Sequence, residues 1–275
     1  MRQSLAERPL TLLAALRAHW PEYLMETAGL GLFMIAACMF TVLLEHPESA
    51  LTQWIEDATL RRYLLGVAMA ATFLGIVYSP WGKRSGAHLN PAVTLTYLTL
   101  GKIRRWDAFF YVVSQFIGGL LGVAAADALV GVPLRHAAVN YAVTTPGPQG
   151  PVTAFIAEFL ISMLMMTAVL TTSNSRRLSR FTPLCAAFLI AVYIAFEAPL
   201  SGMSMNPART LGSAAGAREW TALWVYFTAP PLAMLTAGIL YRFRTGAQRI
   251  VCAKLHHHNH QRCIFRCKYG ELFND

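Results

Sequence analysis

Six long apolar stretches constrain the fold of this chain more than any other feature. A helix needs roughly 20 predominantly apolar residues to cross the hydrocarbon core of a bilayer. Stretches suited to this lie at residues 23–44, 63–80, 108–131, 152–172, 182–200 and 221–241. Because 55% of the residues are hydrophobic and only 13% are charged, the bilayer rather than water is the expected solvent. The sequence therefore predicts an all-α integral membrane protein with six transmembrane helices.

The basic residues gather in alternate connections between these stretches. The formal net charge of +9 results from 23 Lys and Arg and 14 Asp and Glu residues. The basic residues after the second, fourth and sixth stretches include Lys83, Arg84, Lys102, Arg104, Arg105, Arg176, Arg177, Arg180, Arg242, Arg244 and Arg249. By the positive-inside rule these connections, and with them both termini, lie in the cytoplasm. Since the basic residues form no single soluble patch, nucleic acid is not an expected partner.

We expect the chain to have three parts. Residues 1–21 form a cytoplasmic N-terminal segment, residues 22–244 the membrane domain, and residues 245–275 a basic cytoplasmic tail rich in Cys and His. The segment from Pro9 to Trp20 is either a short amphipathic helix in the membrane interface or a plain lead-in. Short connections and the lack of a sorting signal favour a bacterial inner membrane.

An internal repeat relates the two halves of the chain. The segment Ser85–Leu95 recurs as Ser201–Leu211, at an offset of 206 − 90 = 116, with Ser, Gly, Asn, Pro, Ala, Thr and Leu matching. Each copy follows the second stretch of a three-span half. Because three is an odd number, the second half enters the membrane from the opposite side. The sequence therefore predicts an inverted repeat, which places a substrate path between the halves near the midplane.

Each copy of the repeat contains an Asn-Pro-Ala motif that suits the start of a helix. The motifs are Asn90, Pro91 and Ala92 in the first half, and Asn206, Pro207 and Ala208 in the second. Asn is a favourable N-cap, and Pro suits the first helical position because its missing N–H costs nothing there. The apolar run after each motif is too short to cross the bilayer, so each motif is predicted to begin a re-entrant half-helix.

The loops before the motifs are expected to line a cavity, because non-helical backbone at membrane depth is tolerated only where it is buried in protein or faces water. Two half-helices that meet N-terminus to N-terminus each present roughly half a positive charge, which repels cations. If the amides of Asn90 and Asn206 also point into the cavity, they donate to a passing oxygen and interrupt a proton wire. The pair of motifs thus predicts a path for neutral solutes, whereas a single motif could be explained by helix capping alone.

Each half also carries one acid inside its first apolar stretch, Glu26 in the first half and Glu158 in the second. An ionised side chain at that depth costs at least ~2.5 kcal/mol unless it is paired. We expect each carboxylate to accept hydrogen bonds from the re-entrant loop of its own or the opposite half and so hold the loop in shape. The alternative is a packing role within a single helix.

The duplicated Ser-Gly-x-x-x-Asn-Pro-Ala segment, with Arg209 directly after the second copy, closely resembles the aquaporin or major intrinsic protein family. The resemblance covers about residues 20 to 243. It implies six tilted helices, two half-helices, and a homotetramer in which every protomer has its own pore. It further implies a passive channel in the bilayer for water or small uncharged solutes, which excludes protons and ions and needs no cofactor.

The resemblance also implies that Arg209 forms the outer constriction of the pore with three partners. Counting back from the second motif without gaps places Met203 and Ile194 at two of these positions. The third falls at Ala70 or at Met69, because the connection before the first motif leaves room for an insertion. These side chains are the predicted selectivity filter, with Ala70 as the residue from the second span.

The filter departs from the pattern of the water-specific members, which carry His in place of Ile194 and an aromatic residue in the second span. The opening should therefore be wider and more apolar, which favours glycerol, urea, a neutral metalloid acid or ammonia alongside water. Glycerol-type members, however, commonly have Asp directly after the Arg, whereas this sequence has Thr210, and its Ala214 matches water channels. The two indicators disagree, so the solute stays open. Glu197, near the mouth, is expected to be a solvated rim acid or a group that concentrates polar solutes.

The tail contains residue types that bind zinc, although no pair of cysteines has a two-residue spacing. The candidate ligands are Cys252, His256, His258, Cys263 and Cys267. A metal or regulatory site is one interpretation of the tail. The other, which we prefer at this point, is a basic membrane-surface segment that binds no metal.

Two other classes of protein share parts of this pattern. Secondary transporters also contain broken helices and inverted repeats, but they need coupling groups, and the candidate carboxylates here have a structural explanation. A non-conducting membrane scaffold is the second alternative. An enzyme is not expected, because the spans contain no nucleophile with a plausible base.

Overall fold

The computed structural model describes residues 11–246 and 249–270. Within these ranges the regular structure is helical throughout, with no strands. Six helices are long and apolar enough to span a membrane. They are α1 (Leu12–Glu45), α3 (Ala58–Tyr78), α6 (Arg105–Val130), α8 (Gly150–Ser173), α9 (Thr182–Phe196) together with the turn Ser179–Phe181 directly before it, and α12 (Leu223–Thr245). The predicted all-α membrane fold with six spans is confirmed.

Eight short helices connect these spans within the described part of the chain. They are α2 (Ala50–Trp54), α4 (Pro80–Ser85), α5 (Pro91–Thr99), α7 (Val132–Arg135), η1 (Asn140–Ala142), η2 (Ser179–Phe181), α10 (Ala198–Ser201) and α11 (Pro207–Ala217). The helices α5 and α11 have 9 and 11 residues, so they measure about 14 and 17 Å at 1.5 Å per residue. Each therefore crosses about half of a bilayer core of roughly 30 Å.

The first helix begins earlier than the apolar pattern indicates. It starts at Leu12, where the side chain of Thr11 accepts a hydrogen bond from the backbone of Ala14, and it continues through Pro21 without a break. From Leu12 to Trp20 the predicted segment Pro9–Trp20 is thus the first part of α1, whereas Pro9 and Leu10 lie outside the described residues. Hydrophobicity marks only the membrane-embedded part of such a helix.

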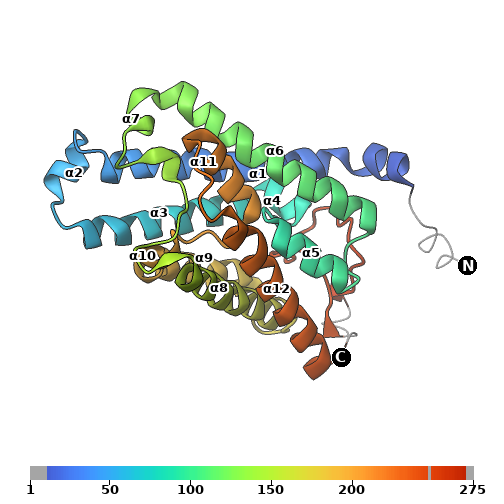
Figure 1. Ribbon diagram of the computed structural model, residues 1–275. Coiled ribbons are helices and arrows are strands. Elements are labelled where there is room, and N and C mark those ends of the chain that lie inside the picture. Colours follow the sequence, from blue (N-terminus) through green and yellow to red (C-terminus); the bar gives the residue numbers. More distant parts are fainter. Residues whose placement is uncertain (1–10, 247–248, 271–275) are drawn as a thin grey trace, which may run out of the picture.

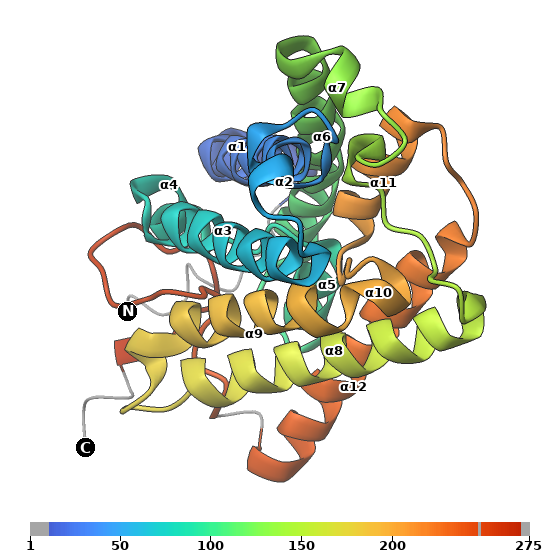
Figure 2. The same ribbon diagram turned by 90° about the vertical axis from the view of Figure 1, so that its left-hand side faces the viewer.

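The two halves pack through equivalent pairs of helices. The helix α1 packs along α6, α8 packs along α12, and each half-helix packs against the last span of the opposite half, α11 on α6 and α5 on α12. Figures 1 and 2 show α11 beside α6 and α5 near α12. The crossed packing joins the halves and brings the starts of the half-helices to the centre.

Glycines permit the closest of these contacts. A Cβ on Gly122 of α6 would lie 2.5 Å from the carbonyl oxygen of Gly31 in α1, and a Cβ on Gly212 of α11 would lie 2.5 Å from that of Gly119. Small residues allow helix backbones to approach in this way inside a membrane, where packing rather than hydrophobic burial drives association.

The outer faces of the bundle are apolar and exposed. Between 22% and 50% of the most apolar window of each span is buried inside the protein, and exposed apolar side chains such as Val67, Leu121 and Leu160 lie on the spans. In water this surface would be unfavourable, whereas lipid chains cover it at no cost. The part of the chain after α12 turns back over the end of the bundle where α1 begins, and Arg262 donates a hydrogen bond to the Ala18 carbonyl oxygen there. Figure 1 shows this segment on the opposite side from α2 and α7.

Candidate functional site: a pore between two half-helices

The two Asn-Pro-Ala motifs form equivalent helix starts. The side-chain oxygen of Asn90 accepts from the Ala92 N–H at 2.8 Å, and that of Asn206 accepts from the Ala208 N–H at 3.0 Å. Each Pro occupies the first turn of its half-helix. These caps satisfy N–H groups that have no partner within the helix.

The same two asparagines connect the half-helices to each other. The side-chain amide of Asn90 donates to the Met205 carbonyl oxygen at 2.7 Å, and the amide of Asn206 donates to the Leu89 carbonyl oxygen at 2.7 Å. Since an amide has two N–H groups, each Asn keeps one donor for another acceptor. Both residues line the central cavity, so that donor is available to a solute.

Glu26 holds the first re-entrant loop. Its carboxylate accepts hydrogen bonds from the Ser85 hydroxyl (2.8 Å), the His88 N–H (3.1 Å), the Leu89 N–H (2.7 Å) and the Gln115 amide (2.9 Å). The carboxylate is fully buried. All four donors belong to the same half of the chain as Glu26.

Glu158 holds the second loop in the same way. It accepts from the Ser201 hydroxyl (2.8 Å), the Ser204 N–H (2.6 Å) and the Met205 N–H (2.7 Å). Sequence reasoning left open whether each acid contacts the loop of its own half or of the other. In the structure both acids bond to their own loop.

Both loops need strained backbone to aim these N–H groups at one carboxylate. Ala87 and Leu89 have φ of 53° and 51°, and the equivalent Met203 and Met205 both have φ of 52°. Left-handed backbone in non-glycine residues costs of order 1–3 kcal/mol each. Hydrogen bonds to a charged group contribute about 1.5–3 kcal/mol each and offset the strain.

Two tyrosines that the sequence analysis did not single out complete the bracing. Tyr111 donates to the Ser85 carbonyl oxygen at 2.6 Å, and Tyr226 donates to the Ser201 carbonyl oxygen at 2.6 Å. Both lie in the third span of their half, at an offset of 226 − 111 = 115, one less than the offset of the motifs. That near-equal offset is the sequence signal that could have found them.

A cavity of about 420 Å³ runs past the motifs. At the end of the bundle near α2 it begins among Glu45, Ala58 and Arg62, and at the other end it reaches Met234 and Leu255. Most of its wall is apolar. The apolar lining includes Leu30, Phe33, Leu65, Phe73, Val93, Met165, Val169 and Ile190.

The predicted filter residues line this cavity. Arg209, Ile194 and Met203 all do so. Of the two candidates from α3, Met69 lines the cavity and Ala70 does not. Successive residues on an α-helix differ by about 100° in direction, so a shift of one position decides which side chain faces the pore.

Arg209 lies close to the motif that positions it. Its backbone N–H donates to the Asn206 side chain at 3.3 Å, and its guanidinium donates to the Ser213 hydroxyl at 3.4 Å. The next residue, Thr210, is buried and hydrogen-bonds with Thr144 at 2.9 Å. Thr210 therefore ties the half-helix to the loop that follows α7 and does not line the cavity.

The charged residues that line the mouth of the cavity are not the one that the sequence predicted there. Glu197 is only 7% exposed and accepts a hydrogen bond from Ser201, so the prediction of a solvated rim acid is wrong. Glu45 and Arg62 line the entrance instead, and Arg62 donates to the Ala195 carbonyl oxygen at 2.9 Å. Sequence reasoning missed both because they lie at the ends of apolar stretches, where a charge is unremarkable.

The structure brings together three of the five candidate metal ligands in the tail, Cys252, Cys263 and Cys267. The imidazole beside them belongs to His257. The ring of His256 instead packs edge-on against Tyr78, with centroids 5.0 Å apart, and His258 is not part of the cluster. Adjacent side chains in an extended segment point in opposite directions, so only one of three consecutive histidines faces the cysteines.

A ring of membrane-spanning helices around two half-helices, with a cavity that passes the starts of both, defines a membrane channel. Comparison with known proteins agrees with this class. The family described as Major intrinsic protein matches residues 14–241. Aquaporin-8 of Notomys alexis is 30% identical over 85% of this chain and 87% of its own length, and Aquaporin-8 of Mus musculus is 29% identical over the same shares.

A solved structure has the same fold. The aquaglyceroporin from Plasmodium falciparum superposes with a TM-score of 0.65, covering 81% of this chain and 95% of its own, at 20% identity. The chain belongs to the major intrinsic protein family. The predicted family and the predicted passive channel for water or small solutes, without enzymatic activity, are thereby confirmed.

Proposed function

We propose that this channel conducts small uncharged solutes with an apolar face, of the size of glycerol or urea, in addition to water. The observation that carries the proposal is the composition of the constriction, in which Arg209 is the cation and Met69, Ile194 and Met203 are apolar. Apolar walls favour the carbon face of a solute, while the guanidinium donates hydrogen bonds to its oxygens. The predicted filter positions themselves carry no imidazole or aromatic ring.

Exclusion of ions fits the same geometry. The two half-helices direct their N-termini, each worth roughly half a positive charge, at the centre of the cavity. Arg209 adds a further positive charge on one side. The free amide donors of Asn90 and Asn206 orient passing oxygens as acceptors, which prevents a continuous donor-to-acceptor chain of water.

The assembly and orientation belong to the same proposal. The start of α1 and the tail share one end of the bundle with the basic connections, which supports a cytoplasmic location for that end. The exposed apolar faces of the spans would allow four copies to pack side by side as a homotetramer. A bacterial inner membrane stays a prediction, and the relatives described above come from rodents.

Stopped-flow light scattering tests the solute. Vesicles reconstituted with the full chain are exposed to gradients of sucrose, glycerol and urea, beside protein-free vesicles. We expect faster shrinkage in sucrose and faster re-swelling in glycerol or urea than in the controls. Accelerated water flow with glycerol and urea fluxes equal to those of empty vesicles would contradict the proposal.

A matched pair of variants tests the assignment from α3. Met69→Ala removes an apolar wall from the constriction, so the ratio of glycerol to water permeability should rise. Ala70→Ser changes the neighbouring residue, which does not line the cavity, and should leave the ratio unchanged. The reverse pattern would mean that Ala70 is the filter residue.

A further inference from the structure

The tail forms part of the wall around the first re-entrant loop. The Leu255 N–H donates to the Gly86 carbonyl oxygen at 3.1 Å, and the His88 imidazole donates through Nε2 to the Ala253 carbonyl oxygen at 2.8 Å. The ring of Phe265 stacks on the ring of His88, with centroids 5.2 Å apart and 12° between the planes. Leu255 also lines the cavity. A segment remote in sequence thus closes the side of the pore next to α5.

This part of the tail is buried but has no regular secondary structure. Residues 250–255 are between 0% and 5% exposed, and residues 251–268 contain no helix or strand. The buried ammonium of Lys254 donates to the carbonyl oxygens of Gln261 and Arg262, which closes the loop between them. Short irregular segments have too little core to hold a fixed shape, and they usually need a disulfide or a metal ion.

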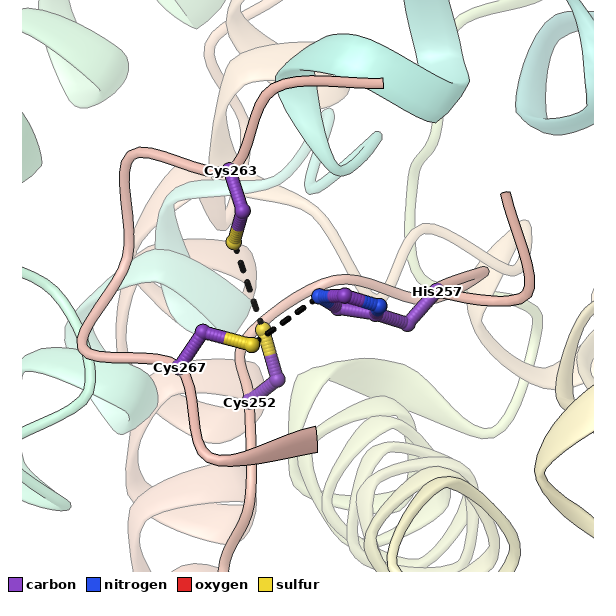
Figure 3. Close-up of side chains that lie close together, drawn as sticks. All are labelled: Cys252, His257, Cys263 and Cys267. Carbon is purple, nitrogen blue, oxygen red and sulfur yellow. Dashed lines mark hydrogen bonds between the residues drawn. The ribbon is translucent and has the colours of Figure 1, made fainter. Parts of the chain in front are cut away.

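Four side chains converge inside this segment, as Figure 3 shows. The Sγ atoms of Cys252, Cys263 and Cys267 and a ring nitrogen of His257 all lie within 4.8 Å of one another. The Cys252 and Cys263 sulfurs are 3.6 Å apart, and the Cys267 sulfur is 3.0 Å from Nε2 of His257. The four residues are spread over residues 252–267 of the tail, yet their ligand atoms meet in one place.

These distances fit a metal site better than a disulfide. A disulfide needs about 2.05 Å between sulfurs, and three cysteines would leave one over. A tetrahedral zinc ion with Zn–S bonds of about 2.3 Å places its sulfur ligands about 3.8 Å apart, close to the observed separation. Cys3His is also one of the common ligand sets of structural zinc sites.

The chemistry of the thiols agrees with the geometry. The thiolate is the form that binds metals. Thiolates and imidazole select zinc over the hard cations magnesium and calcium.

We propose that Cys252, His257, Cys263 and Cys267 bind one zinc ion as a closed structural site that fixes the tail onto the mouth of the pore beside Gly86 and His88. Cys252 is adjacent to Ala253, so an ion held there fixes the residues that contact the loop. The proposal concerns the tail and does not depend on which solute the channel conducts.

The metal content of the purified full chain tests the site directly. The protein is isolated through an affinity tag without histidine and assayed by inductively coupled plasma mass spectrometry. We expect about one zinc per chain for the wild type and a large loss for Cys263→Ser with Cys267→Ser. Zinc well below one per chain in the wild type, or unchanged zinc in the double variant, would overturn the proposal.

The run of histidines provides a matched control against surface binding. His257→Ala should lower the zinc content, whereas His258→Ala and Cys185→Ser, which lie outside the cluster, should retain it. Replacement of zinc by cobalt should give thiolate-to-cobalt charge-transfer absorption and the visible bands of a tetrahedral ion. Equal losses in His257→Ala and His258→Ala would indicate loose binding by the histidine run and would overturn the site.

Two further readouts test the alternative of a disulfide and the role of the ion. After chelation under denaturing, non-reducing conditions, five cysteines should react with a maleimide, whereas three would show a disulfide and contradict the proposal. Chelation of the folded protein should expose the tail to trypsin, and added zinc but not magnesium should restore protection. Cleavage that is independent of zinc would contradict the fixing of the tail.

Discussion

The loops that precede α5 and α11 are built alike but are covered differently. Each loop is held by one buried carboxylate from the first span of its half and by one tyrosine from the third. The loop before α5 contacts the irregular tail through Gly86 and His88. The loop before α11 contacts the segment after α7, where a Cβ on Gly202 would lie 2.9 Å from the Cα of Thr144.

The comparison separates what both halves share from what each contributes. The shared parts fix the position of the half-helices and must be symmetric, because the two helix starts meet at one point. The residue directly after each motif does not need to be the same in both halves. It is Val93 in the first half and Arg209 in the second. The cation of the proposed filter therefore comes from the second half only, whereas the loop that the tail covers belongs to the first half.

The largest expected effect comes from removing a brace. Glu26→Ala removes the acceptor of four buried hydrogen bonds, and Glu158→Ala removes that of the Ser204 and Met205 N–H groups, while the Ser201 hydroxyl keeps Glu197. An unsatisfied buried donor costs about 1–3 kcal/mol, so either change should lower the unfolding midpoint by about 10 °C or more. Thermal unfolding in detergent checks this, with Glu→Gln at each site as an intermediate control. A melting curve like the wild type for either Ala variant would refute the shared bracing role.

Arg209→Val makes the two halves alike after the motif. The change deletes both bulk and positive charge from the constriction, so larger neutral solutes and some cations should pass several-fold faster. Vesicle flux assays with glycerol, a larger polyol and potassium measure this. Proton flux should stay low, because the centre at Asn90 and Asn206 is unchanged. If the variant conducts the larger polyol and potassium no faster than the wild type, Arg209 does not set the constriction.

Ile194→His leaves the difference between Arg209 and Val93 in place but makes one predicted filter residue polar. The substitution replaces an apolar wall opposite Arg209 by a polar one, so glycerol loses a favourable contact and water gains a hydrogen-bond partner. A contact worth about 1 kcal/mol changes a permeability ratio about five-fold. The glycerol-to-water ratio from stopped-flow measurements should therefore fall. An unchanged ratio in a folded variant would place selectivity at the motifs rather than at the constriction.

The smallest expected effect concerns the tail side. Leu255→Ala removes a cavity-lining side chain distant from Arg209, so water and glycerol permeabilities should rise modestly and by the same factor. Ile264→Ala, a buried tail residue that does not line the cavity, is the matched control. A change in the glycerol-to-water ratio in Leu255→Ala would mean that both ends of the pore contribute to selectivity.

Much of the fold and the centre of the pore could be predicted from the sequence. The length of each apolar stretch determines whether it can span a bilayer. The duplicated motif identifies the half-helices, because Asn followed by Pro is typical of the start of a helix. The acids Glu26 and Glu158 could be found for the same reason, since a charge at that depth needs partners. Their equivalent positions in the repeat pointed to equivalent roles.

The sequence by itself determined the spans, the inverted repeat and the residues at the motifs, because these follow from local composition and spacing. Only the tertiary structure decided which neighbour faces the cavity, Met69 rather than Ala70, since a helix turns about 100° per residue and a count along the sequence does not fix its rotation. It also decided which histidine of the tail meets the three cysteines, because an irregular segment has no period from which to predict direction. Such positions depend on contacts between segments far apart in the chain, and spacing within one segment does not encode them.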